Sequence, residues 1–280
     1  ALDEDTPRRR RVLVGATLLN GAAYVGTMLQ AAPWALRDAR WLFLLWMSAV
    51  YVTSAWMGRA SRLSGVSTVC LLLGLSWLTL AIPLKATGHW MSTWWVLEVP
   101  VCAIAGLVGR RPAMRAFAVG LAALVTLWLL TSAVWSTAPM ALLWWHMPER
   151  VFHGLLGTLA MVICAEAYRR PAWRAEVRPW ETRADLGYLV LAAAIGWTLT
   201  CLEVPERWLP QALAAESAAL VMLGWRRADP AVRLLGVAGW LSVACRLLAD
   251  FVLGLPWALP PVGGIVVLGY GMAWAFRRAP

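Results

Sequence analysis

Charged residues are scarce in this sequence of 280 residues, of which 14% are charged and 61% are hydrophobic. A soluble domain of ordinary composition is about one quarter charged and about half apolar. The apolar residues recur in blocks along the whole chain, and a run of about 20 such residues is long enough to cross a bilayer. The scarcity of charge therefore argues against a soluble protein and predicts an integral membrane protein.

The sequence also lacks the motifs of the commonest enzymes. GxSxG, Walker A and GxGxxG are missing, and no metal-ligand spacing accompanies the three histidines. The five cysteines stand inside apolar blocks without a CxxC spacing, so we interpret them as small core residues. We therefore predict no catalytic residue, no metal site and no cofactor.

Phenylalanine is rare, with five residues against twenty tryptophans. Indole rings favour the boundary between membrane and water, and many of the tryptophans stand at the ends of apolar blocks. Trp94 and Trp95 lie inside a block, close to Glu98. They are interpreted either as interface anchors or as the wall of a pocket for an amphiphile or a sugar-linked lipid.

Ten apolar blocks are long enough to span a membrane, so we predict an all-α bundle of ten transmembrane helices that forms a single unit over residues 1–280. The blocks lie near 12–31, 41–58, 65–84, 90–109, 113–135, 150–168, 185–202, 208–225, 231–254 and 259–276. Between the fifth and sixth blocks, residues 136–148 are expected to lie along the membrane surface as a short amphipathic segment.

Basic residues are distributed unevenly between these blocks. Nineteen of the 25 fall on one side of the predicted membrane and five on the other, and Arg246 lies within the ninth block. The positive-inside rule then places both termini in the cytoplasm of a bacterial cell, with residues 1–11 as a basic N-terminus and 169–184 as a cytoplasmic loop. The net charge of +10 is thus a topology signal and predicts no nucleic-acid partner.

Some of these cytoplasmic arginines are also candidate contacts for anionic lipid headgroups. They are Arg110, Arg111, Arg115, Arg169, Arg170 and Arg174.

The chain also repeats itself at a constant offset of 118 positions. The offset relates Trp90, Glu98, Gly106 and Arg115 to Trp208, Glu216, Gly224 and Arg233. The predicted copies cover about 77–130 and 197–248. Because the offset spans four predicted helices, both copies have the same orientation in the membrane and are parallel repeats.

The repeat resembles that of a bacterial family of polytopic membrane proteins, the domain of unknown function 2339. The resemblance is carried by residues 78–84, Gly88, Trp90, Trp95, Glu98, the basic cluster 110–115, residues 246–250, Arg277 and Arg278, and by Asn20 and Tyr24. Members of that family tend to be longer, so the resemblance implies a short member or a C-terminal portion. It implies a multi-spanning helical fold and no particular activity, since that family has none assigned.

Ionisable side chains inside a membrane are costly and usually face a bundle interior or a water-filled cavity. The candidates here are Glu98, Glu216, Arg246 and Asp250, with the polar Asn20. Each glutamate lies eight residues past an outer tryptophan, which is a depth of ~12 Å, and Arg246 is expected at a similar level. We therefore predict a buried charge layer, in which Arg246 pairs with Asp250 or with a glutamate.

Two interpretations of this layer remain open. The glutamates either line a cavity that binds a cationic group or takes up protons, or they only lock the repeat units together. Pro100 follows Glu98, and the second copy has no matching proline, so the two sites are not expected to be equivalent.

Three functions follow from these interpretations. The first is transport or flipping of a lipid or envelope amphiphile, and the second is a non-catalytic scaffold or accessory subunit with partner membrane proteins. The third, an intramembrane enzyme acting on lipid-linked substrates, would need Glu98 or Glu216 together with His153. In each case the lipid bilayer itself is the main partner.

Overall fold

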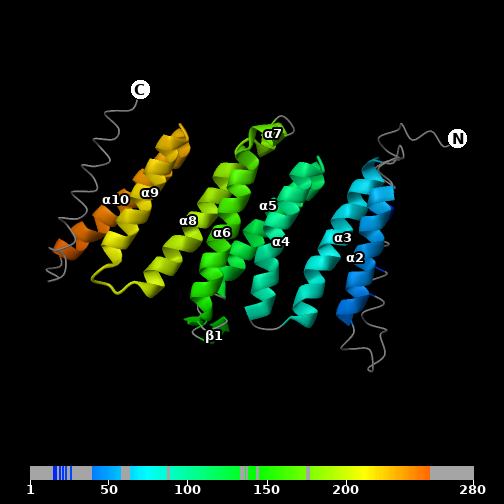
Figure 1. The fold of residues 1–280 in the computed structure, drawn as a ribbon, viewed down its shortest axis with the longest axis horizontal. Helices are drawn as coiled ribbons and strands as arrows, with labels where there is room; N and C mark the ends of the chain where they lie inside the picture. Colours follow the sequence, from blue (N-terminus) through cyan, green and yellow to red (C-terminus); the bar gives the residue numbers. More distant parts are fainter. Residues whose placement is uncertain are drawn as a thin grey trace. The chain divides into compact units, whose positions relative to one another are not determined.

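A computed structural model describes residues 40–57, 64–86, 89–132, 138–142, 145–174 and 177–252, with the isolated positions 15–17, 19, 21, 23, 26 and 136. Helices form nearly all of the regular structure in these ranges (Figure 1). The long helices are α2 (Arg40–Met57), α3 (Ser64–Lys85), α4 (His89–Val108), α5 (Pro112–Thr131), α6 (Glu149–Arg169), α8 (Ala184–Glu203), α9 (Leu209–Arg226) and α10 (Pro230–Val252). The short elements are α7 (Pro171–Arg174), η3 (Pro179–Glu181), β1 (Pro139–Leu142) and β2 (Trp145–Pro148).

Six helical segments in the described ranges are long and apolar enough to cross a membrane. They are Val66–Lys85, Trp90–Val108, Pro112–Thr131, Glu149–Arg169, Pro179–Glu203 and Pro230–Leu248. The prediction of an all-α membrane protein is therefore confirmed. The predicted blocks 41–58 and 208–225 form the 18-residue helices α2 and α9, which are not among the six. The blocks 12–31 and 259–276 lie largely or entirely outside the described residues.

The chain divides into two compact units. Unit 1 comprises Ala1–Val125 and Arg170–Arg178, and unit 2 comprises Thr126–Arg169 and Pro179–Pro280.

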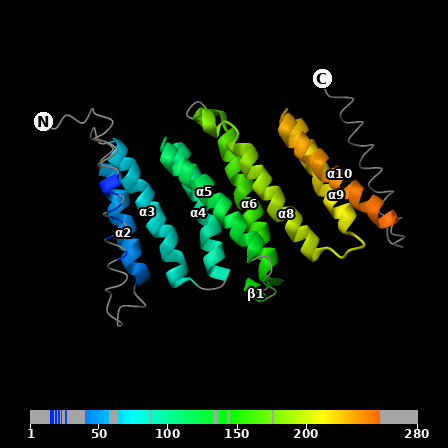
Figure 2. The same ribbon diagram turned by 180° about the vertical axis from the view of Figure 1, so that it is seen from behind.

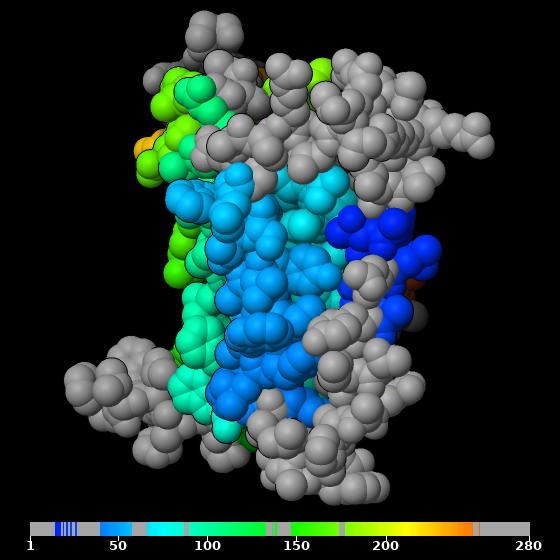
Figure 3. All heavy atoms as spheres, turned by 90° about the vertical axis from the view of Figure 1, so that its right-hand side faces the viewer, coloured from blue at the N-terminus to red at the C-terminus, as the bar shows by residue number. Residues whose placement is uncertain are grey.

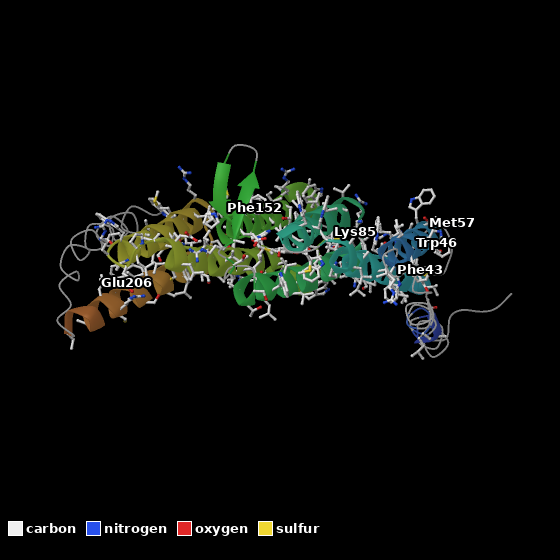
Figure 4. All side chains as sticks on the ribbon, turned by 90° about the horizontal axis from the view of Figure 1, so that it is seen from below. Phe43, Trp46, Met57, Lys85, Phe152 and Glu206 are labelled. Atoms are coloured by element: carbon white, nitrogen blue, oxygen red, sulfur yellow. The ribbon has the colours of Figure 1, made fainter. Side chains whose placement is uncertain are left out.

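In unit 1, α2 and α3 lie side by side (Figures 1 and 2). Gly74 permits this close approach, because a Cβ there would lie 3.1 Å from the carbonyl oxygen of Ser48. Leu44 and Met47 of α2 pack with Ala81 of α3 in a buried cluster. Part of α2 lies on the face that Figure 3 shows, and Trp46, which is labelled in Figure 4, is more than half exposed. An apolar residue in that position is typical of a surface that faces lipid.

In unit 2, α6 packs along α8 and α9 packs along α10 (Figures 1 and 2). Glycines again form the contacts: Gly154 and Gly157 of α6 lie against Leu199 and Ile195 of α8. Small residues allow helix backbones to approach closely, which is how helices associate in lipid without a hydrophobic driving force.

Residues between α5 and α6 differ from the prediction of an amphipathic surface segment. They form an antiparallel two-stranded hairpin, in which Pro139 is opposite Pro148 and Leu142 is opposite Trp145. The hairpin projects from the helices of unit 2 (Figure 4). Pairing the two strands satisfies backbone polar groups that an unpaired loop near lipid would leave without partners.

Candidate intramembrane site

The contact between α3 and α4 is built around Thr79. Pro83, four residues later in α3, has no N–H, so the carbonyl of Thr79 loses its usual helical donor. The indole of Trp95 in α4 takes that place, and its Nε1 donates to the Thr79 oxygen at 3.0 Å. The proline thus creates an acceptor in α3 that a side chain of α4 satisfies.

Glu98 reaches the same threonine from α4. Its Oε1 lies 2.8 Å from the Thr79 hydroxyl, which is also 3.0 Å from the carbonyl oxygen of Leu75. The glutamate is 8% exposed. Its Oε2 is buried and has no hydrogen-bond partner within the described part of the chain. A carboxyl group with an unsatisfied buried oxygen is costly to maintain, and this marks Glu98 as a candidate binding group.

Glu216 has a comparable but distinct environment in unit 2. The hydroxyl of Thr200 in α8 donates to Glu216 Oε1 in α9, and the glutamate is half-buried. At the offset of 118, Thr79 corresponds to Trp197, so Thr200 is not its counterpart. Both glutamates therefore bind a threonine of the preceding helix, but the two threonines do not occupy matching positions of the repeat.

The turns after these two helices have the same backbone geometry. Arg110 and Ala228, which are 118 positions apart, are the non-glycine residues with positive φ in the described ranges, at 54° and 51°. The hydrogen bonds from Arg111 N to Gly106 O and from Asp229 N to Gly224 O are both 2.8 Å long. The sequence repeat is thus matched by a repeated turn.

Each turn places a glycine against an arginine of the following helix. A Cβ on Gly106 would lie 2.7 Å from Cγ of Arg115, and one on Gly224 would lie 2.8 Å from Cγ of Arg233. Larger residues at either glycine would separate the two helices of the hairpin.

The two turns differ in the residue that precedes the proline of the following helix. Asp229 accepts from the backbone N–H of Ala231 at 2.9 Å and caps α10. Its counterpart Arg111 instead donates to the hydroxyl of Ser67 in α3, at 3.4 Å.

The residues of the predicted charge layer differ in their burial. Glu98 is buried and Glu216 half-buried, but Arg246 is exposed on α10. The reason is that α10 packs through a different stripe, which includes Gly239, Val243 and Leu247.

The pairing of Arg246 with Asp250 stays a prediction, because the side chain of Asp250 lies outside the described part, as does Asn20. The neighbouring tryptophans have separate roles: Trp94 is exposed, whereas Trp95 binds Thr79.

The arginines proposed as lipid contacts differ in their exposure. Arg110 and Arg170 are exposed, Arg111 and Arg169 are partly buried, and only the backbone of Arg174 is described. Arg115 is 1% exposed, and its Nη1 donates to the Gly106 carbonyl at 3.3 Å. The prediction of a lipid contact at Arg115 is therefore wrong, because its side chain fills the turn.

Two ion pairs join helices of unit 2 near opposite ends of α6. Arg150 at the start of α6 pairs with Glu203 at the end of α8, and Glu166 pairs with Arg227, which follows α9. Burial lowers the pKa of Arg227, and the nearby Asp229 acts in the opposite direction. Sequence reasoning missed both pairs, because their members lie 53 and 61 positions apart.

Substituting Glu166 is expected to cost more than substituting its partner. The Arg227 side chain is 10% exposed, so Glu166→Gln leaves a largely buried charge without its partner and should destabilise the protein by about 1 kcal/mol. Arg227→Met removes that charge while keeping volume, so its loss should be smaller. Detergent unfolding followed by circular dichroism tests this order, and the reverse order would contradict the argument.

The remaining candidate chemistry is limited. His153 is fully buried in α6 and lies edge-on to Phe152, with ring centroids 5.4 Å apart. Among the residues that the structure describes, no three His, Cys, Asp or Glu side chains gather where they could hold a metal ion.

Comparison of the chain with known protein families, with curated proteins and with solved structures finds no match. The inference of function therefore depends on the site itself.

Proposed function

We propose that this protein is a membrane carrier that moves or flips a lipid or another envelope amphiphile. The observation that carries the proposal is Glu98, which is buried inside a span-length helix with one oxygen that has no partner among the described residues. Ionisable groups at such positions usually mark substrate or ion pathways. A headgroup with a cationic or hydrogen-bond-donating group would complete the coordination of this carboxyl.

The surface of α4 suits an amphiphilic substrate. Trp90, Trp94 and Val101 follow each other at helical spacing and are all more than half exposed, so they form an apolar surface for acyl chains. Glu98 faces Thr79 of α3 instead. One helix thus offers an apolar surface and a polar group at neighbouring positions.

The proposal includes the membrane arrangement. We infer ten spans with both termini in the cytoplasm of a bacterial inner membrane, and parallel repeats at about 77–130 and 197–248. The matching turns at Arg110 and Ala228 support the repeats. The arginines of both turns support a cytoplasmic location for that side. Membership of the domain of unknown function 2339 family is part of the same proposal and adds no activity to it.

Replacing Glu98 is expected to abolish movement of the amphiphile while leaving a folded protein. Proteoliposomes carrying a fluorescent phospholipid on both leaflets, quenched from outside by dithionite, measure this movement. Glu98→Gln keeps the shape of the side chain and should lower the protein-dependent rate at least tenfold. Glu206→Gln, in the exposed turn before α9, is the control and should keep the rate (Figure 4). An unchanged rate in Glu98→Gln, or no protein-dependent rate at all, would contradict the proposal for this substrate.

A scaffold function is the second candidate, and the paired hydrogen bonds favour it. Thr79 to Glu98 and Thr200 to Glu216 each join consecutive helices, which is also what a purely structural lock would do. Native mass spectrometry in mild detergent distinguishes the two. A protein partner at fixed ratio supports the scaffold, and a retained lipid supports the carrier.

A further inference from the structure

We propose that Glu98 is a proton-binding site and holds a proton that Glu216 does not. The inference rests on the proposed carrier function only for its purpose, since the protonation state itself follows from the geometry. It names the proton as the second ligand of the site and assigns different roles to the two glutamates of the repeat.

Thr79 has fewer hydroxyl hydrogens than its contacts require. Its hydroxyl has one hydrogen but lies within hydrogen-bond distance of two acceptors, the Leu75 carbonyl at 3.0 Å and Glu98 Oε1 at 2.8 Å. A carbonyl oxygen can only accept. Both short contacts are satisfied together when Thr79 donates to Leu75 and a protonated Glu98 donates to the threonine oxygen.

No such conflict exists at Glu216. The Thr200 hydroxyl donates to Glu216 Oε1, and within the described ranges no second acceptor competes for its hydrogen as the Leu75 carbonyl does at Thr79. An ionised Glu216 accepts that bond directly. The glutamate is also less buried than Glu98, so its charge is less costly.

Charged and titratable groups also lie along the helices next to Glu98. On α3, Lys85 lies six residues beyond Thr79, ~9 Å along the axis, with its amine over the Trp41 ring at 5.0 Å. On α5, Arg115 binds the Gly106 carbonyl, and Gly106 lies eight residues past Glu98, ~12 Å along α4. The other titratable groups of α3 and α4 are the buried thiols Cys70 and Cys102 and, at the start of α4, His89. Lys85 and Arg115 are thus held near the ends of their helices.

Release of the proton needs only local movement. When Glu98 ionises, its proton passes to water, and the Thr79 hydroxyl can turn from Leu75 to the carboxylate. A cationic headgroup that binds at Oε2 favours the ionised form, so substrate and proton compete for one carboxyl. Binding of the amphiphile would then release a proton.

Infrared spectroscopy of the reconstituted protein tests the site directly. The carbonyl stretch of a protonated carboxyl should be present at neutral pH, shift in deuterium oxide, disappear in Glu98→Gln and remain in Glu216→Gln. Thr79→Val removes the acceptor and should move this band to higher frequency, which a role in packing alone would not do. Absence of the band in the wild-type protein, or its loss in Glu216→Gln alone, would overturn the inference.

The outcome is separable from the carrier proposal. If the Glu98 band is present but no lipid moves, the proton site stands and the carrier function is rejected. If lipid moves but the band is absent, the carrier function stands and the proton site is rejected. Circular dichroism of each variant confirms that the helices remain, and Glu98→Asp, which keeps the carboxyl, should retain a shifted band.

Discussion

Arg115→Ala is expected to destabilise the protein by about 3–5 kcal/mol, which is the cost of truncating a large side chain in a packed interior. Arg115 is among the largest fully buried side chains in the described ranges. It lies over Gly106 and donates to its carbonyl, so the substitution opens a cavity in the turn and removes that donor. Unfolding of the purified protein by increasing SDS, followed by circular dichroism, measures the loss.

Arg233→Ala is the matched control, because Arg233 occupies the corresponding position of the second turn. Its side chain is only half-buried, so the cost should be less than half as large. Equal losses of stability in the two variants would show that the burial of Arg115 does not determine how much it stabilises the protein. Both arginines would then stabilise it through the repeated backbone turn.

Gly236→Ala is expected to destabilise the α9–α10 pair by about 3 kcal/mol, the upper range for overpacking. A Cβ at this position would lie 2.6 Å from the Ser217 carbonyl oxygen and 2.7 Å from the Val221 amide nitrogen. Both are backbone atoms of α9, so a side-chain rotation cannot relieve the clash. The two helices would have to move apart, and thermal unfolding in detergent should record a lower midpoint.

Gly187→Ala, in the same unit, is expected to stabilise the protein. Gly187 is exposed in α8, and a Cβ there meets nothing within 4 Å. Alanine should therefore stabilise the helix by roughly 0.5–1 kcal/mol through its better helix propensity. If both substitutions lowered the midpoint equally, the close approach at Gly236 would not be the cause.

The helices could be predicted closely from sequence because a helix that crosses a bilayer needs about 20 consecutive apolar residues. Prolines mark the starts of two of them, since α5 begins at Pro112 and α10 at Pro230. The hairpin over residues 139–148 could not be predicted in this way. Its strands are four residues long, too short for alternation to distinguish them from an interfacial helix.

The candidate site was predictable in its residues but not in its partners. Glu98 and Glu216 stand out in the sequence because charge inside a span is rare. Thr79 carries no such signal, since threonines are common in helices that cross membranes. Its importance depends on Pro83, which frees the carbonyl that Trp95 binds, and a proline four residues after a threonine could have indicated this.

The turn between α9 and α10 also has a consequence for how the chain is made. The backbone bonds that close it, such as Asp229 to Gly224, and the Asp229 cap join residues no more than five positions apart. This hairpin therefore needs no distant segment in order to close, and we expect it to form as soon as both halves have left the ribosome. The earlier turn adds the bond from Arg111 to Ser67, whose helix has by then been synthesised. The order of synthesis and the order of assembly thus coincide.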